Sequence, residues 1–450
     1  MRDILVTAIV LGVLPWVFRH AWVGVLLWTW ISIMNPHRLT WGFANNAPFA
    51  AMAAGATLLA LVTTKDPVRL PNAPAVKVLI AFIVWMSVTT VFAMSPGESL
   101  LQLAKVMKIQ LMTLIALAVL HEKKTILLFV WINALSLGFF GLKGGVFTVM
   151  TGGQERVWGP GGFIGGNNEV GLAILVAIPL MYFLYLEKSQ EWINRVLQKW
   201  VRRGLLVTML FSAVAVLGTQ SRGAFLAIGV MSFVLWWRAP KKLLLGVGVV
   251  LTAVTALAVM PWTLQEKIDS ITEYRQDASA MGRINAWETA INVANDRIFG
   301  AGYDMYNPTT WAMYAPNPTE QRATDPSIIR AAHSVYFQVL GEHGWFGLFL
   351  YLLLGWMVWQ AAARLRMKTG HDLDFRWVYM LAGMCQVSLI GFAVGGAFLS
   401  LAYFDLPYNL LVIVVAADRW LNAELATKQH AVANSKPGCN NGDALSHGTH

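Results

Sequence analysis

Long apolar runs separated by short polar connectors make up most of this chain. A helix needs about 20 apolar residues to cross the roughly 30 Å hydrocarbon layer of a bilayer, and such runs recur from one end of the sequence to the other. They predict an all-α polytopic membrane protein with about 12 spans. The runs cover residues 4–34, 44–62, 78–94, 104–120, 125–150, 170–186, 205–217, 223–237, 243–260, 345–363, 377–398 and 406–417.

The first run leaves the number of spans open. It is too long for one straight helix, and Pro15, Arg19 and His20 interrupt it. It fits either a single broken crossing or a tight hairpin, which gives 12 or 13 spans in total. Its charged start resembles a secretory signal, but no small-x-small cleavage site follows, so we expect a retained first span.

Lys and Arg are distributed unevenly between the two sets of connectors. If residues 4–34 form one crossing with the N-terminus inside, the short outer connectors hold only Arg38, Arg156 and Arg222, against 17 such residues inside. Cytoplasmic loops are enriched in Lys and Arg, so the richer set is predicted to be cytoplasmic. It comprises Lys65, Arg69, Lys77, Lys123, Lys124, Lys188, Arg195, Lys199, Arg202, Arg203, Arg238, Lys241, Lys242, Arg364, Arg366, Lys368 and Arg376.

One long polar segment, residues 261–344, then lies on the outer face. Within it we expect an amphipathic helix over 281–298 that lies along the membrane surface, a loop rich in Pro and Asn over 307–318, and a short helix over 334–342. The apolar face of the first helix is predicted to comprise Ile284, Trp287, Ile291 and Val293.

These features divide the chain into four parts. A polar C-terminal tail rich in Gly, Asn and Ser is predicted to be disordered and to lie inside. The parts are transmembrane helices at 1–260, the outer segment at 261–344, transmembrane helices at 345–420 and the tail at 421–450.

Composition agrees with this class. The chain is 56% hydrophobic with only 13% charged residues, whereas soluble domains carry about 25%, and a β-barrel would show alternating segments of about 10 residues. The net charge of +10 follows from the inner connectors and does not indicate nucleic-acid binding. Cys385 and Cys439 give neither a disulfide framework nor a CxxC metal site.

Two arginines on the outer face are candidate anion ligands. Arg222 follows Ser221 where an apolar run restarts, so a guanidinium would add to the free N–H groups of a helix N-terminus and favour phosphate or carboxylate. Arg283 lies one helical turn before Trp287, so both point the same way. Taken singly, each is as well explained by snorkelling or anchoring at the membrane interface.

His333, followed by Ser334, is the candidate general base. Histidine suits proton transfer because its ordinary pKa, about 6.5, lies near neutral pH. A lone histidine is more often a polar interface residue, and Glu342 and His343 are nearby competitors for the role.

Arg156 opens a Gly-rich outer stretch, residues 157–168, whose backbone can approach a ligand closely or simply form a flexible loop. It is not a P-loop, because the Gly-Lys-Ser/Thr ending is absent. Lys105 and Lys108, near the outer start of a span, are candidate phosphate ligands or part of a translocation path.

No metal site or cofactor is predicted. The acidic pair Asp372 and Asp374 lies in a basic inner connector, and neither HExxH nor a G-x-S-x-G nucleophile elbow occurs. If the chain transfers a glycan from a diphosphate donor, arginines would have to stabilise the leaving group.

The ordered set of outer motifs resembles the O-antigen ligase and polymerase superfamily of bacterial inner-membrane glycan transferases. The resemblance extends from about residue 156 to 408 and looks closest to the O-glycosylation ligases of exosortase-containing bacteria. It is carried by Ser221-Arg222-Gly223, Arg283-x-x-x-Trp287, Phe299-Gly-Ala-Gly302, and His333-Ser334 with Leu340, Glu342, Gly344 and Gly347.

The resemblance implies a glycan transferred from undecaprenyl diphosphate to an acceptor hydroxyl on the periplasmic side, without metal or nucleotide. For ligases the acceptor is the lipid A-core oligosaccharide. By that analogy Arg222 and Arg283 hold the donor diphosphate and His333 accepts the acceptor's proton. Arg156, Trp287, Lys105, Lys108 and Ser334 are expected to assist substrate binding, and the fold would be the helical type of lipid-linked sugar transferases.

Several alternatives remain open at this point. The acceptor of a polymerase would be another lipid-linked glycan, and that of a protein O-oligosaccharyltransferase would be Ser or Thr. A transporter for an anionic lipid would place charges near mid-span on broken helices. A scaffold protein would leave the outer arginines and histidine without a purpose. The chain could act as a monomer, although the sequence does not set its oligomeric state.

Overall fold

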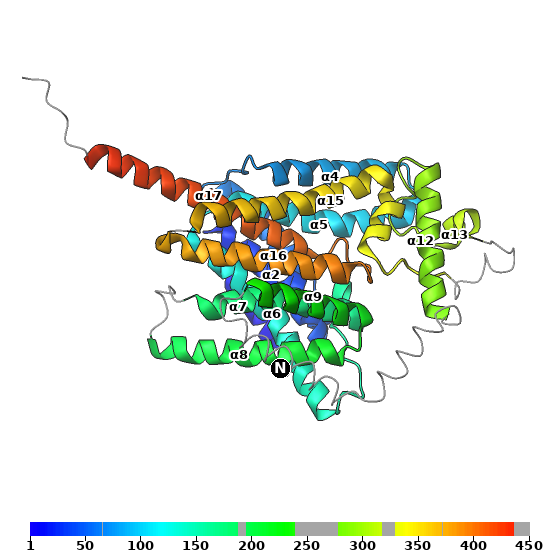
Figure 1. Cartoon of the computed structure of the whole chain (residues 1–450), viewed down its shortest axis with the longest axis horizontal. Coiled ribbons are helices and arrows are strands. Elements are labelled where there is room, and N and C mark those ends of the chain that lie inside the picture. Colours follow the sequence, from blue (N-terminus) through cyan, green and yellow to red (C-terminus); the bar gives the residue numbers. More distant parts are fainter. Residues whose placement is uncertain (65, 188–194, 239–277, 317–328, 371, 436–450) are drawn as a thin grey trace, which may run out of the picture.

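The computed structural model describes residues 1–64, 66–187, 195–238, 278–316, 329–370 and 372–435, which form helices and loops with no strand among them (Figure 1). Each predicted span except 243–260, which lies outside the described residues, coincides with helix. The helices are α1 (Arg2–Val17), α2 (Ala21–Met34), α3 (Phe49–Thr63), α4 (Pro74–Val91), α5 (Pro96–Val119), α6 (Lys123–Met150), α7 (Asn167–Leu186), α8 (Arg195–Gly218), α9 (Arg222–Arg238), α12 (Ala278–Asp296), α13 (Pro308–Tyr314), α15 (Val335–Thr369), α16 (Arg376–Gly396) and α17 (Asp405–Ser435), with 3-10 helices η1 (Pro36–Leu39), η2 (Phe43–Asn46), η3 (Gly162–Ile164) and η4 (Leu373–Phe375).

Seven of the described helices are long and apolar enough to cross a membrane by length and composition, and α2 and α3 are shorter apolar helices. The chain is therefore a multi-pass helical membrane protein. The total of about 12 spans remains a prediction.

The first apolar run forms a hairpin, which is one of the two arrangements that the sequence left open, so the single crossing assumed for counting charges does not apply. Asp3, at the start of α1, accepts hydrogen bonds from the backbone amides of Gly42 and Ala44 in the connector after α2 (3.0 and 3.1 Å). His20, between α1 and α2, contacts Asp66 beyond α3 (3.1 Å). Helices α1 and α2 are thus antiparallel, and the N-terminus lies at the end of the bundle that is poor in Lys and Arg.

Small residues let the central helices approach closely. On α6, a Cβ at Gly141 would lie 2.8 Å from Ser212 Cβ, and one at Gly145 would lie 2.8 Å from the carbonyl carbon of Phe211, both on α8. Glycines spaced by four residues form one face of a helix, and in a bilayer such faces favour association through backbone proximity. The α6–α8 pair is therefore specified by glycine spacing rather than by bulky apolar contacts.

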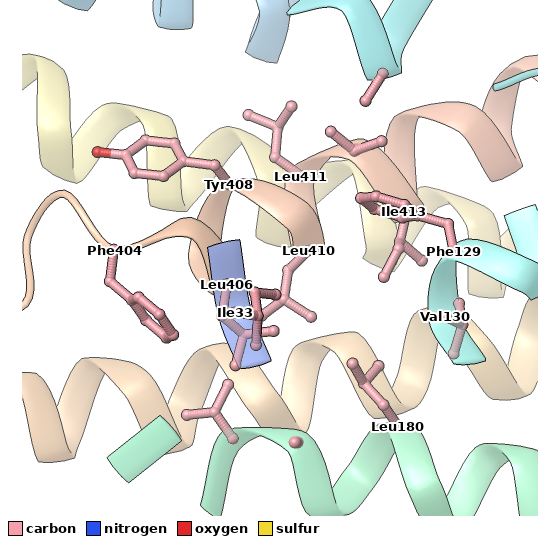
Figure 2. Packing of buried hydrophobic residues seen from close by; sticks show 14 of the residues in the cluster. Ile33, Phe129, Val130, Leu180, Phe404, Leu406, Tyr408, Leu410, Leu411 and Ile413 are labelled. Carbon is pink, nitrogen blue, oxygen red and sulfur yellow. The ribbon is translucent and has the colours of Figure 1, made fainter. Parts of the chain in front are cut away.

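Helix α17 occupies the middle of the bundle. Apart from Asp405 and Asn409, which are buried and bonded to Ser32 and Asn133, its first three turns are apolar on every side, as expected of a helix surrounded by others, and Leu410 and Ile413 are fully buried. Figure 2 shows these side chains packed with Ile33 of α2, Phe129 of α6 and their neighbours. Helix α17 continues to Ser435, so the predicted disorder of residues 421–450 is wrong for 421–435, and 436–450 lie outside the described residues.

The described part of the outer segment covers one end of the bundle. Helix α12 runs across the ends of α4, α15 and α16 in Figure 1, which agrees with the predicted surface helix. Its buried side is lined by Ala286, Ala290 and Val293, however, while Ile284 is 38% exposed. The predicted apolar face was thus partly wrong, because close contact with the bundle selects small residues.

Two local predictions within this segment have different outcomes. The predicted short helix over 334–342 is confirmed: α15 begins at Val335 and is interrupted at Gly344, whose φ of 70° is not helical. The loop predicted over 307–318 instead contains α13, a short helix that starts at Pro308 and is capped by the Asn307 side chain, which accepts from the Thr310 amide. Residues 317–328 lie outside the described residues.

Candidate active site at the end of the bundle

His333 lies in the turn that leads into α15, with its backbone in the left-handed region at φ 46°. Residues other than glycine rarely adopt this conformation, and where they do it is often at functional sites. The side chain is half-buried, and Nδ1 is shielded from solvent with no hydrogen-bond partner among the described residues. The ring is therefore fixed by backbone and packing, and its nitrogens are not committed to the described part of the protein.

Helix α12 holds this turn in place through Trp287. The indole Nε1 donates to the carbonyl oxygen of Ala332 (2.7 Å), and the ring stacks on Phe337 of α15 with centroids 4.9 Å apart. Arg283 lies one helical turn before Trp287 and therefore on the same side of α12. Sequence analysis assigned Trp287 to substrate binding. In the structure its contacts instead give it a positioning role beside His333.

The surroundings of His333 keep its imidazole neutral. Burial lowers the pKa of His333 from its ordinary value, and the positive charges of Arg283 and Arg330 lower it further. Arg330 packs along α12, since a Cβ at Gly282 would lie 3.0 Å from Arg330 Cγ. A neutral imidazole beside arginines can accept a proton near pH 7.

Replacing Arg330 with glutamine is expected to move the acid limb of the pH–rate profile to higher pH. Removing a nearby positive charge raises the pKa of His333 toward its ordinary value, so the imidazole becomes protonated, and inactive as a base, at a higher pH. The measurement is glycan transfer rate, as kcat/KM, against pH. The Arg330→Lys variant keeps the charge and should retain the native profile; coincident profiles for Arg330→Gln and Arg330→Lys would contradict the coupling.

A second group of side chains surrounds the start of α9. Gln220, also in the left-handed region at φ 54°, accepts from Arg156 Nε (3.3 Å) and donates to the carbonyl oxygen of Gly153 (3.0 Å). These bonds, together with one from Asn167 to the Thr219 carbonyl oxygen (2.9 Å), fix the Gly-rich loop against the α8–α9 turn. Arg222 is the first residue of α9, and its side chain is exposed.

The end of α16 lies between the two groups. Tyr336, three residues after His333, donates to the carbonyl oxygen of Ala393 (2.6 Å). On the other side a Cβ at Gly223, next to Arg222, would lie 2.7 Å from Phe398 Cβ. The structure therefore places Arg222 and His333 at the same end of the bundle, on neighbouring elements.

Three other predicted site residues have different surroundings. Lys105 and Lys108 are exposed on α5. Within the described part of the chain, no hydrogen bond or ion pair links either lysine to His333 or to Arg222. Ser334 is only 1% exposed as the N-cap residue of α15. Its role in substrate binding remains a prediction, and its burial favours a structural one.

Glu342 and His343, the competitors for the role of base, are both buried. Glu342 is 4% exposed and accepts hydrogen bonds from the Tyr403 hydroxyl and from the Asp304 amide (3.2 Å). His343 is fully buried, and its Nδ1 lies 2.7 Å from Thr89 Oγ1. Both therefore join α15 to neighbouring segments, which leaves the half-buried histidine before α15 as the candidate base.

The Phe299-Gly-Ala-Gly302 motif has a structural explanation. Gly300 and Gly302 both have positive φ, 66° and 82°. The backbone amides of Ala301 and Gly302 donate hydrogen bonds to the carbonyl oxygens of Gly341 and Glu342, respectively (2.9 and 3.0 Å). The motif thus fixes the loop after α12 to the short helix that follows His333.

The Gly302→Ala substitution is expected to destabilise the protein by about 2–4 kcal/mol, because it combines left-handed strain with overpacking. A Cβ there would lie 2.9 Å from both Ala93 Cα and Ser99 Oγ. The measurement is the thermal midpoint of the detergent-purified protein. Gly97→Ala is the matched control, since nothing lies within 4 Å of that Cβ position. Equal midpoints for the two variants would refute this account of the motif.

Three residues of the site escaped sequence analysis. Gln220 and Phe337 belong to no motif used in the sequence analysis, and their contacts are seen only in the folded chain. Arg330 comes close to His333 and Arg283 because the chain turns back over α12. Proximity to Ser221-Arg222 and to His333 in the sequence was the available signal for Gln220 and Arg330.

Comparison with known families gives two matches along the chain. Residues 207–352 match the sequence model of a family described as O-antigen ligase, and residues 1–189 match that of a family of unknown function. The first match spans Arg222, Arg283 and His333. This match relates the chain to the O-antigen ligase superfamily through residues 207–352, and that relation implies a glycan ligase activity in general terms. A search of curated proteins gives no match to the chain.

Proposed function

We propose that the chain is an O-antigen ligase that transfers a glycan from undecaprenyl diphosphate to a hydroxyl of lipid A-core oligosaccharide on the periplasmic face of the bacterial inner membrane. The observation that carries this proposal is His333, which is strained, kept neutral and placed beside Arg283 at the end of the bundle where Arg222 begins α9. The O-antigen ligase match over the same residues supports it.

In the proposed reaction the acceptor oxygen forms a bond to the anomeric carbon while the bond from that carbon to the diphosphate oxygen breaks. The acceptor proton passes to the imidazole of His333. Negative charge grows on the leaving diphosphate, and Arg222 and Arg283 stabilise it through charge-assisted hydrogen bonds that strengthen in the transition state. This division of roles needs neither a metal ion nor a nucleotide.

A single displacement inverts the anomeric centre, so we expect an inverted product. The anomeric configuration of donor and product, compared by NMR, tests this. A trapped glycosyl-enzyme intermediate would instead show retention.

The acceptor is the least constrained part of the proposal. A polymerase or a protein O-oligosaccharyltransferase would use the same donor chemistry with a different hydroxyl, and the charge distribution does not separate them. The transporter alternative has less support, because none of the three residues lies at mid-span. Arg222 is the first residue of α9, His333 lies in the turn before α15, and Arg283 lies on α12 at the end of the bundle.

The direct test is transfer by purified protein supplied with undecaprenyl-diphosphate glycan and lipid A-core in the presence of EDTA. Formation of glycosylated lipid A-core supports the proposal, including independence from metal. Glycan lengthening or peptide modification would replace the acceptor and keep the chemistry. Failure with all three acceptors, from a folded protein, would favour the transporter.

A further inference from the structure

The end of the bundle opposite His333 holds two arginines that converge on one buried amide. Arg238 is the last residue of α9, and Arg366 lies in the last turn of α15. The Nη1 atoms of both donate to Oε1 of Gln386 on α16, each at 3.2 Å. Gln386 is only 2% exposed, and both arginines are half-buried, so the two guanidinium groups meet at the edge of the helix packing.

Aromatic rings hold both guanidinium groups in place. Arg238 lies over the ring of Trp359, 5.7 Å from its centroid, and Arg366 lies over Tyr379 at 4.9 Å. Arg366 Nη2 also donates to the Tyr379 hydroxyl (3.0 Å). A cation over an aromatic face is attracted by the ring, so these arginines are ordered before any ligand arrives.

No carboxylate in the described part of the chain balances the charges of these two arginines. The Nη1 atoms of Arg238 and Arg366 each lie 3.2 Å from Oε1 of Gln386, so the two nitrogens are no more than twice this distance apart. Gln386 is neutral and therefore does not offset their charge. Among the described residues neither arginine forms an ion pair with a carboxylate, and Arg366 Nε is shielded from solvent without a hydrogen-bond partner. Two like charges held this close in partly buried surroundings repel each other, and an accompanying anion relieves that repulsion.

We propose that Arg238 and Arg366 bind a phosphate group at this end of the bundle. A phosphate presents several oxygens to two planar forks at once, which a single carboxylate does less well. The group could belong to the phosphodiester of an anionic glycerophospholipid or to free phosphate, since both offer the same oxygens. The site is separate from the one at His333, because α9 carries Arg222 at its first residue and Arg238 at its last.

The test is ligand-induced stabilisation of the detergent-purified protein. Phosphatidylglycerol, phosphatidylcholine and inorganic phosphate are titrated separately against the thermal midpoint, and retained lipid is read by native mass spectrometry. Greater stabilisation by phosphatidylglycerol than by phosphatidylcholine would show that the phosphate group belongs to an anionic lipid. Stabilisation by inorganic phosphate would show that the site binds free phosphate. No stabilisation by any of them would overturn the proposal.

The variant Arg238→Gln/Arg366→Gln is expected to weaken binding of the stabilising ligand by at least about tenfold, because it removes both charge-assisted contacts. Arg376→Gln is the matched control, an exposed arginine at the start of α16 that should bind as the native protein does. Equal affinity of the double variant and the control would refute the site. If the double variant does not fold, Arg366→Lys keeps the charge and loses the fork; its binding should be weaker than native, and native affinity would refute the site.

Discussion

Replacing His333 with alanine is expected to reduce glycan transfer by about 10²–10⁴-fold, the usual contribution of a positioned general base. Its Nδ1 has no hydrogen-bond partner among the described residues and the ring is half-buried, so the loss should fall on catalysis rather than on folding. Transfer to lipid A-core is measured with purified variants at saturating donor.

Because the backbone at His333 is left-handed, the variant that removes its imidazole should tolerate a positive φ. Alanine adds strain there, whereas asparagine tolerates positive φ. His333→Asn therefore removes the base and keeps the turn, and it should be as inactive as His333→Ala. His430→Ala, at an exposed position on α17, controls for loss of a histidine. Native transfer rates from a folded His333→Asn would show that the residue is not the base.

Replacing Arg283 with glutamine is expected to lower kcat by about 10²–10³-fold, the effect of removing one donor that stabilises charge formed in a transition state. Arg283 lies on the face of α12 that carries Trp287, whose indole is bonded to Ala332 beside His333. In the proposed reaction this guanidinium stabilises the leaving diphosphate as its negative charge grows. The measurement separates kcat from KM with undecaprenyl-diphosphate glycan as the varied substrate.

Arg283→Lys keeps the charge but loses the two-point geometry, so its rate should lie between those of the native enzyme and Arg283→Gln. Arg38→Gln is the control, because Arg38 is an exposed arginine of an outer connector with no part in the proposed site. An increase in KM with kcat unchanged would show that Arg283 binds donor and transition state equally, and would remove it from leaving-group stabilisation.

The helices were predictable because their signal is local. A run such as residues 125–150 must be helical in hydrocarbon, where each backbone polar group needs a partner within its own segment, and α6 covers 123–150. The short helix before Gly344 was predictable for a similar reason, since glycine permits the non-helical φ that ends it. The ordered motifs also sufficed to relate the chain to O-antigen ligases, and the family match over 207–352 includes Arg222, Arg283 and His333.

The sequence left the local structure open, or predicted it wrongly, where contacts between residues distant in the chain determine it. Pro15, Arg19 and His20 fit a broken helix and a hairpin equally well; the bonds of Asp3 to Gly42 and Ala44 select the hairpin. Residues 308–314 have loop composition, yet the Asn307 cap and packing of Trp311 stabilise a helical turn.

The sequence by itself determined the class of protein, the position of nearly every described helix and the residue types available for chemistry, because hydrophobic runs and motifs are properties of neighbouring residues. Only the tertiary structure distinguished the surroundings of the two neighbouring histidines. It buries His343 against Thr89 and holds His333 at the edge of the packing between α12 and α15. It also brought Arg330 to His333 and joined Arg238 to Arg366 through Gln386. Such pairings depend on how helices distant in the chain pack together, and no local pattern encodes them.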